Sequence, residues 1–181
     1  MPTDEGRAAA RAELTAATVG AGAVAAAATG GAFVAFGARA GDPLLHVNAL
    51  AGILLDSRVS FVTGPHAVVT SVGALLLVAL TFLWAALFVG AALTLGLRRG
   101  AGLLLASCTA AVLAFCVDAL VLPRLAGEST LAALSLPRLA LVHLLLAGAF
   151  PIGMRLALSG RYSTSDDALG APRVYRSGDD G

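Results

Sequence analysis

The sequence contains no lysine, and charged residues of all kinds make up only 13% of its 181 residues. Its basic residues are all arginine, and they leave a net charge of +1 at neutral pH. Recognition of a phosphate backbone requires clustered basic side chains on one face of a protein. This low and nearly balanced charge therefore excludes a nucleic acid as the partner.

Cysteine is also scarce, with Cys108 and Cys116 as the only two. Both fall in one expected helix, about 12 Å apart along its axis, whereas a disulfide requires Cα atoms within about 7 Å. They cannot pair with each other in an intact helix, and no expected loop contains a cysteine. This excludes the loop cysteine pairs of disulfide-generating four-helix membrane oxidoreductases. It favours two small apolar packing residues.

Motifs for catalysis and cofactor binding are missing as well. The chain has no phosphate loop, no His-Glu-x-x-His, no Gly-x-Ser-x-Gly and no Cys-x-x-Cys. The sequence therefore predicts a protein that is not an enzyme, with no catalytic residues, no cofactor and no bound metal.

Apolar residues, in contrast, make up 58% of the chain, and the mean hydropathy is +0.87. Both values lie above the ordinary range of soluble domains. Several runs of about 20 apolar residues are each long enough to cross roughly 30 Å of hydrocarbon, and one soluble core cannot absorb them all. The sequence predicts an all-α integral membrane protein, a bundle of four transmembrane helices.

Four apolar runs define the expected spans, at about residues 14–38, 67–97, 101–122 and 135–158. The connection at 98–100 is too short for anything but an antiparallel helical hairpin. Pro151 is placed to kink the fourth span. We expect the four spans to form a single membrane domain over residues 1–158.

The first run is the weakest of the four, because it consists mostly of Ala, Gly, Val and Thr. A cleaved signal peptide is its rival: Arg7 and Arg11 supply a basic n-region, and residues 38–40 have the small-x-small form of a cleavage site. The apolar stretch, however, exceeds the roughly 7 to 15 residues of a signal sequence. Its length favours a retained helix.

The distribution of arginine predicts the orientation. The N-terminal flank, the second loop and the C-terminal flank carry eight arginines, whereas the first and third loops carry four. By the positive-inside rule, we expect a multi-pass protein of the cell membrane with both termini in the cytoplasm.

Two segments outside the spans differ in character. Residues 41–65 are too apolar for a free linker, and Asp42-Pro43 is typical of a helix start. We expect a short extracytoplasmic helix from Pro43 to about Leu55, which lies on the membrane interface or caps the bundle. Residues 159–181 are polar and rich in Gly, Ser and Asp, and we expect a disordered cytoplasmic tail there.

Two ionisable residues lie inside the expected spans. Asp118 and His143 stand on antiparallel neighbours, both roughly 6 to 8 Å below the outer surface. A carboxylate at that depth is costly unless it faces protein, water or a partner. We expect the two to meet as an intramembrane polar pair, with Arg124 and Arg138 as alternative partners of Asp118. The pair is interpreted as a structural clasp, with a proton or ion relay and an Asp118 that reaches water as alternatives.

His46 and His66 fall on the same outer side and are further candidates. Imidazole and carboxylate groups are the usual ligands of Zn, Cu and Fe, so a metal or haem site at this face is a possible interpretation. No two histidines, however, are three or four residues apart. The spacing favours chance placement.

Small residues recur at four-residue intervals in a pattern that lets helices approach closely. The pairs are Ala16/Gly20, Thr18/Gly22, Ala27/Gly31 and Gly96/Gly100. A chain this rich in Ala and Gly produces the pattern by chance. Close helix packing is nevertheless expected for the first span. A helix with few large side chains makes few favourable contacts with lipid and many with a closely packed neighbouring helix. We expect that span to be buried or to face a partner.

Three functional hypotheses follow. The first is a non-catalytic membrane protein, either an accessory subunit or a self-associating bundle, whose partners are the lipid bilayer and a second protein or copy held through small-residue helix faces. The second is a small proton- or ion-coupled transporter that uses Asp118 and His143, which predicts a wet cavity around them. The third is a haem- or quinone-associated redox subunit, which predicts a visible absorption band.

Overall fold

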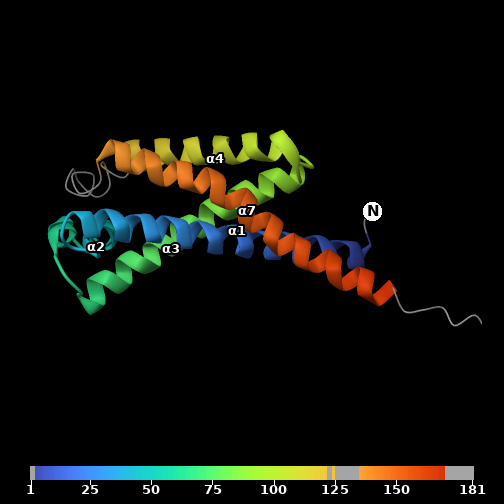
Figure 1. The fold of residues 1–181 in the computed structure, drawn as a ribbon, viewed down its shortest axis with the longest axis horizontal. Helices are drawn as coiled ribbons and strands as arrows, with labels where there is room; N and C mark the ends of the chain where they lie inside the picture. Colours follow the sequence, from blue (N-terminus) through green and yellow to red (C-terminus); the bar gives the residue numbers. More distant parts are fainter. Residues whose placement is uncertain (1–2, 122–123, 125–134, 170–181) are drawn as a thin grey trace, which may run out of the picture.

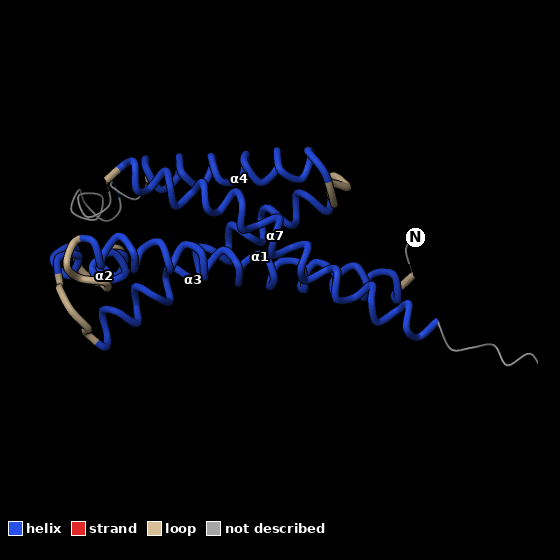
Figure 2. Tube along the Cα trace, in the orientation of Figure 1, coloured by secondary structure: helices blue, strands red, loops and turns tan. Residues whose placement is uncertain are grey.

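The protein is all-helical over the described residues of a computed structural model, namely 3–121, 124 and 135–169, with no strand among them. This confirms the expected helical class. The elements are α1 (Asp4–Arg39), α2 (Leu45–Ala51), the 3₁₀ helix η1 (Ser57–Phe61), α3 (Ala67–Thr94), α4 (Gly100–Leu120) and α7 (Leu136–Leu169). Turns and short loops join the elements from α1 to α4 (Figure 2).

Four helices are long and apolar enough to cross a membrane: α1, α3, α4 and the Leu136–Ser159 part of α7. They coincide with the four predicted spans, as a multi-pass membrane protein requires. The first helix begins at Asp4, earlier than predicted, because the Thr3 side chain accepts a hydrogen bond from the Gly6 amide. Asp4 and Glu5 also favour the positive amino end of the helix.

The carboxyl end of α7 differs from the prediction. The helix continues to Leu169, so residues 159–169 are helical where the composition predicts disorder. Extending a helix that is already nucleated costs little per residue, and composition alone does not reveal that the preceding turns are held in place. Residues 170–181 of the expected tail lie outside the described residues.

The helices α1 and α7 form the central pair of the bundle. They run antiparallel, so that Arg138 at the start of α7 lies over Phe36 near the end of α1, and Gly153 lies against Gly20. On the other sides, α3 packs against α1, and α4 packs against α7 (Figure 1). Both ends of the described chain lie at one end of the bundle, and α2 lies at the other.

Glycine permits the close approach of α1 and α7. A Cβ atom at Gly153 would lie 2.2 Å from the Gly20 carbonyl oxygen, and one at Gly20 would lie 2.5 Å from the Gly153 carbonyl oxygen. At Gly22, a Cβ would lie 2.8 Å from the Phe82 ring of α3. The predicted close packing of the first span thus occurs inside the chain, on both α7 and α3.

The other small-residue pairs have different roles. Gly96 and Gly100 adopt positive φ angles of 69° and 74° in the connection between α3 and α4. They form a turn, which agrees with the expectation that the pattern arises by chance outside the first span. Ala27 and Gly31 lie on an exposed face of α1, where a Cβ at Gly31 would meet nothing within 4 Å.

The predicted short helix is present as α2, although it is shorter than expected. It packs against α1 and α3 at the end of the bundle. Glycines again allow the contact, because a Cβ at Gly73 would lie 1.9 Å from the Val47 carbonyl oxygen and one at Gly37 would lie 2.4 Å from the Asp42 carbonyl oxygen. Of the two expected positions, the helix therefore takes the one that caps the bundle.

Two clusters of buried side chains form the core. The larger joins α1, α3, α4 and α7 and includes Phe88 and Phe150, whose stacked rings are 5.4 Å apart. The smaller lies under the cap and contains Phe33, Phe36, Val47, Leu50 and Val142. Polar side chains reach this interior at only a few places, and those places define the candidate site.

Candidate functional site

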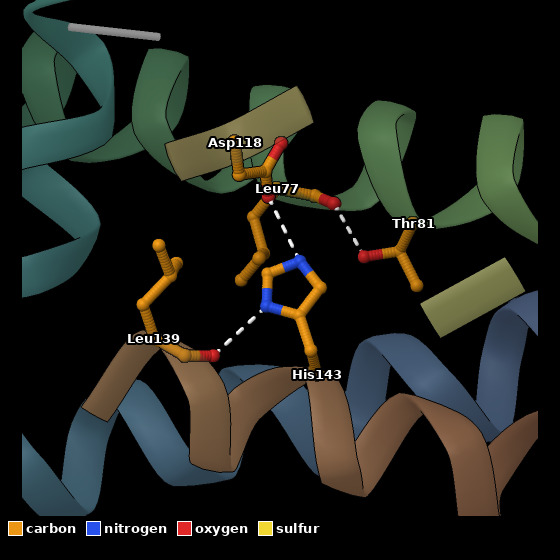
Figure 3. A network of polar contacts seen from close by, with 5 residues as sticks. All are labelled: Leu77, Thr81, Asp118, Leu139 and His143. Carbon is orange, nitrogen blue, oxygen red and sulfur yellow. Dashed lines mark hydrogen bonds and ion pairs between the residues drawn. The ribbon is translucent and has the colours of Figure 1, made fainter. Parts of the chain in front are cut away.

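Asp118 and His143, which the sequence analysis paired, lie in contact between α4 and α7. The Nε2 atom of His143 is 3.1 Å from Oδ2 of Asp118, and its Nδ1 atom is 2.8 Å from the Leu139 carbonyl oxygen (Figure 3). Phe115 covers the imidazole with an edge-on ring whose centroid is 5.6 Å away. The histidine is buried, and 20% of the Asp118 side chain is exposed.

The two hydrogen bonds of His143 depend on where the protons of the pair lie. The Leu139 carbonyl oxygen is only an acceptor, so Nδ1 of His143 must donate its proton there. Nε2 then either donates to an ionised Asp118 or accepts a proton from a neutral one. In both arrangements the imidazole and the carboxyl group share two protons. Both hydrogen bonds can thus form in an ion pair or in a neutral pair, and these two forms differ in the position of one proton.

A second polar bond joins the same two helices. The Ser107 hydroxyl donates to the Ala147 carbonyl oxygen over 2.7 Å, and both residues are buried. In a regular helix that carbonyl would accept from the amide of residue 151, but Pro151 has no N–H to donate. A serine on α4 thus satisfies the carbonyl that a proline frees in α7.

The surroundings of the pair are mostly apolar. A groove of about 280 Å³ borders His143, and it is lined by Cys108, Ala111, Val112, Phe115, Ala140, Leu144 and Ala147 together with the histidine. Thr81 also lies nearby, but its hydroxyl donates to the Leu77 carbonyl of its own helix over 2.7 Å (Figure 3). The described surroundings therefore fit a dry clasp better than a water-filled pathway.

The two arginines proposed as alternative partners lie elsewhere. The Arg138 guanidinium is 5.9 Å from the centre of the Phe36 ring, a cation–π arrangement that joins α7 to α1. Arg124 is exposed beyond the end of α4. Asp118 contacts His143 rather than Arg138.

His46 is fully buried in the cap, which its place in a loop did not predict. Its ring centroid lies 6.4 Å from that of Phe33 and 6.3 Å from that of Phe36. Neither ring nitrogen has a hydrogen-bond partner within the described residues. Burial lowers the pKa of His46 below its ordinary 6.5, the charge of Arg138 acts in the same direction, and Asp42 opposes them. A neutral imidazole fits this site.

The three histidines do not converge on one site. His66 is exposed at the start of α3, His46 lies under the cap, and His143 lies between α4 and α7. Across residues 3–121, 124 and 135–169, no three His, Cys, Asp or Glu side chains gather closely enough to hold a metal ion. The interpretation as a metal or haem site therefore gains no support from the described residues.

Sequence reasoning missed two polar centres outside the spans. Asn48 donates from its side-chain amide to the Val62 and Gly64 carbonyl oxygens, each over 3.0 Å, and accepts from the Thr70 hydroxyl over 2.8 Å. Asp42 accepts from the Gly64 amide over 2.7 Å. An asparagine in the middle of an apolar loop was the signal, because such a group needs partners once it is buried.

The second polar centre that sequence reasoning missed is an ion pair at the opposite end of the bundle. Arg98 makes a two-pronged ion pair with Glu13, with N–O distances of 2.8 and 3.1 Å. It ties the start of α1 to the connection between α3 and α4. The sequence feature that could have indicated this ion pair is a carboxylate directly before one span and an arginine directly after another.

These contacts define a bundle with four helices long and apolar enough to cross a membrane, and its few buried polar groups mostly bond to one another. Comparison with known proteins returned no match from family models, curated proteins or solved structures.

We predict that Ser107 and Pro151 are energetically coupled. Ser107→Ala should cost about 1–3 kcal/mol, because it leaves the Ala147 carbonyl oxygen buried without a donor. In a Pro151→Ala background the cost should be much smaller, since the new amide of residue 151 can donate to the same carbonyl. Thermal unfolding in detergent measures both values.

Thr109→Val is the control, because the Thr109 hydroxyl donates to the Leu105 carbonyl of its own helix. Equal costs of Ser107→Ala in the two backgrounds would refute the coupling.

We also predict that Asp118 and His143 are coupled as a clasp. Asp118→Asn and His143→Gln should each lower the melting temperature, and their losses should fail to add, because either change breaks the same contact. Interhelical polar pairs in membranes average about 0.6 kcal/mol, so the coupling should not exceed roughly 2 kcal/mol.

A relay at this pair gives the opposite pattern. The variants would then melt close to the unmodified protein, while Asp118→Asn would abolish a proton flux that the unmodified protein shows in liposomes. Additive losses of stability would count against the clasp.

Proposed function

We propose that this chain is a non-catalytic subunit of the cell membrane that associates with a second copy of itself through the outward face of α1. The observation that supports this most directly is the exposed pair Ala27 and Gly31. Of the four small-residue pairs in the sequence, two have a glycine packed against another helix and one forms a turn. Ala27/Gly31 alone presents a close-packing surface to the outside.

The outward face of α1 consists mostly of small residues at a regular four-residue spacing. Every fourth residue along it is exposed, namely Val19, Ala23, Ala27, Gly31 and Ala35. Such a stripe offers lipid few side-chain atoms, but it allows the backbone of a neighbouring helix to approach closely. Because the stripe is nearly uniform along the helix, the same surface on a second copy is complementary to it in an isologous pair.

The polar groups of the bundle also fit a structural role. Asp118, His143 and the Leu139 carbonyl bond to one another, and Ser107 is occupied by the Ala147 carbonyl. An internally satisfied set of polar groups fixes the rotation and register of α4 against α7 without reacting with a substrate. We therefore assign these residues to the assembly of the bundle.

Self-association predicts a specific cross-link. In a protein with Cys108 and Cys116 replaced by serine, Ala27→Cys should give a disulfide-linked dimer when membranes are oxidised, because the two stripes bring this position close to its symmetry mate. Ala86→Cys, on an exposed position of α3, should not. Adding Gly31→Leu should suppress the dimer, whereas Gly148→Leu, at an equally open glycine of α7, should leave it unchanged. Equal cross-linking of both cysteines would exclude this interface.

For orientation we propose that both termini face the cytoplasm, on the strength of the arginine bias. Leu54 and Leu95 are exposed at opposite ends of the bundle, with exposed fractions of 64% and 68%. In the cysteine-free protein, Leu54→Cys should react with an impermeant thiol reagent added to intact cells, and Leu95→Cys should react only after the membrane is opened. The reverse pattern would invert the topology.

A proton carrier is the second candidate function. It is favoured by the contact between Asp118 and His143, which joins two groups that can each hold a proton on adjacent helices. The liposome measurement described for this pair tests it, because an unmodified protein that carries no proton flux would remove it. The apolar lining of the adjacent groove makes it the weaker candidate.

A further inference from the structure

A pocket of about 410 Å³ opens at the end of the bundle that holds the α3–α4 connection. Its lining consists of Arg98, Arg99, Met154, Arg155, Leu158 and Ser159. Three of these six residues are arginines, although the whole chain contains only twelve basic residues. We refer to it as the arginine pocket.

The charges of the arginine pocket are only partly balanced. Glu13 holds Arg98 in a two-pronged ion pair, which neutralises one guanidinium and fixes its position. Arg99 and Arg155 are exposed, and neither pairs with an acidic group within the described residues. They stand on different elements, the α3–α4 connection and α7, which converge on one cavity. The pocket therefore keeps an excess of positive charge that an anion would offset.

The wall of the pocket is apolar. Met154 is fully buried and Leu158 is half-buried, and both belong to the part of α7 that is apolar enough to span a membrane. A basic rim above an apolar wall suits an amphipathic ligand, because arginine binds phosphate oxygens through two parallel N–H groups while hydrocarbon contacts the wall.

The depth of the pocket indicates the source of such a ligand. The apolar part of α3 ends at Thr94, α4 begins at Gly100, and that of α7 ends at Ser159. Arg98 and Arg99 thus lie where the apolar lengths of α3 and α4 stop, and Arg155 lies about one helical turn before the apolar length of α7 stops. This is the level of lipid phosphates at a membrane surface. Basic pockets between helices at this level attract anionic headgroups.

We propose that the arginine pocket binds a phosphate group, carried by an anionic phospholipid whose headgroup lies between Arg99 and Arg155 and whose chain lies along Met154 and Leu158. Arg98, held by Glu13, forms the fixed side of the site. This inference is independent of self-association, since the pocket and the outward stripe of α1 share no residue. It adds a ligand class that neither candidate function supplies.

The test uses the full chain in nanodiscs made either of phosphatidylcholine alone or with added phosphatidylglycerol, with bound lipid counted by native mass spectrometry. The unmodified protein should retain phosphatidylglycerol in preference to phosphatidylcholine. The double variant Arg99→Gln/Arg155→Gln should bind it about 30-fold more weakly, as expected for losing two interfacial arginines. The matched control is Arg39→Gln/Arg58→Gln, which removes the same charge from exposed positions at the other end of the bundle and should reduce binding less than about twofold.

A second arm separates the two sources of phosphate. Inorganic phosphate is titrated into lipid-free protein in a neutral detergent, with and without the double variant. Binding of phosphatidylglycerol alone assigns the site to a lipid, whereas binding of inorganic phosphate that the double variant loses assigns it to a soluble phosphate. Equal retention of the two lipids by the unmodified protein, together with no binding of inorganic phosphate, would overturn the proposal. Equal losses in the two double variants would also overturn it.

Discussion

The contact between the backbones of α1 and α7 is the constraint on which the rest of the structure depends. At Gly20 and Gly153 neither helix has room for a Cβ atom, so the two axes approach more closely than side chains usually permit. This leaves α1 and α7 as a central antiparallel pair, with α3 packed on the first and α4 on the second. The polar contacts between α4 and α7 form on this central pair.

A chain with few polar groups in an apolar setting must satisfy each of them locally, since an unpaired donor or acceptor costs more there than in water. Asp118 has His143, and the carbonyl that Pro151 leaves free has Ser107. In the cap, Asn48 bonds to three partners. His46 differs, because neither of its ring nitrogens has a hydrogen-bond partner in the described chain, whereas Oε1 of Glu13, also without a hydrogen bond, still has the Arg98 guanidinium 2.8 Å away. Its neutral form lowers the cost of that burial.

Apolar runs and helix rise were sufficient to predict the four helices and the common depth of Asp118 and His143. They could not predict contacts that depend on the rotation of each helix about its axis. The helix α4 is apolar on all sides, so periodicity does not show that Ser107 faces Ala147. The burial of His46 between Phe33 and Phe36 depends on how α2 folds back on α1, which local sequence does not encode. The turn at Gly96 and Gly100 could not be predicted either, because spacing alone cannot distinguish a packing face from a turn.

The pairing of Ser107 with the carbonyl freed by Pro151 has a consequence for α4 as a moving part. This helix packs mainly against α7, and two polar bonds join them. Their groups are about three helical turns apart on α4 and about one turn apart on α7. Rotating α4 by one residue, about 100°, would carry the Ser107 hydroxyl and the Asp118 carboxyl group away from their partners on α7 at the same time. Both polar bonds therefore form at a single rotation of α4 about its axis, and a rotation of one residue breaks them together.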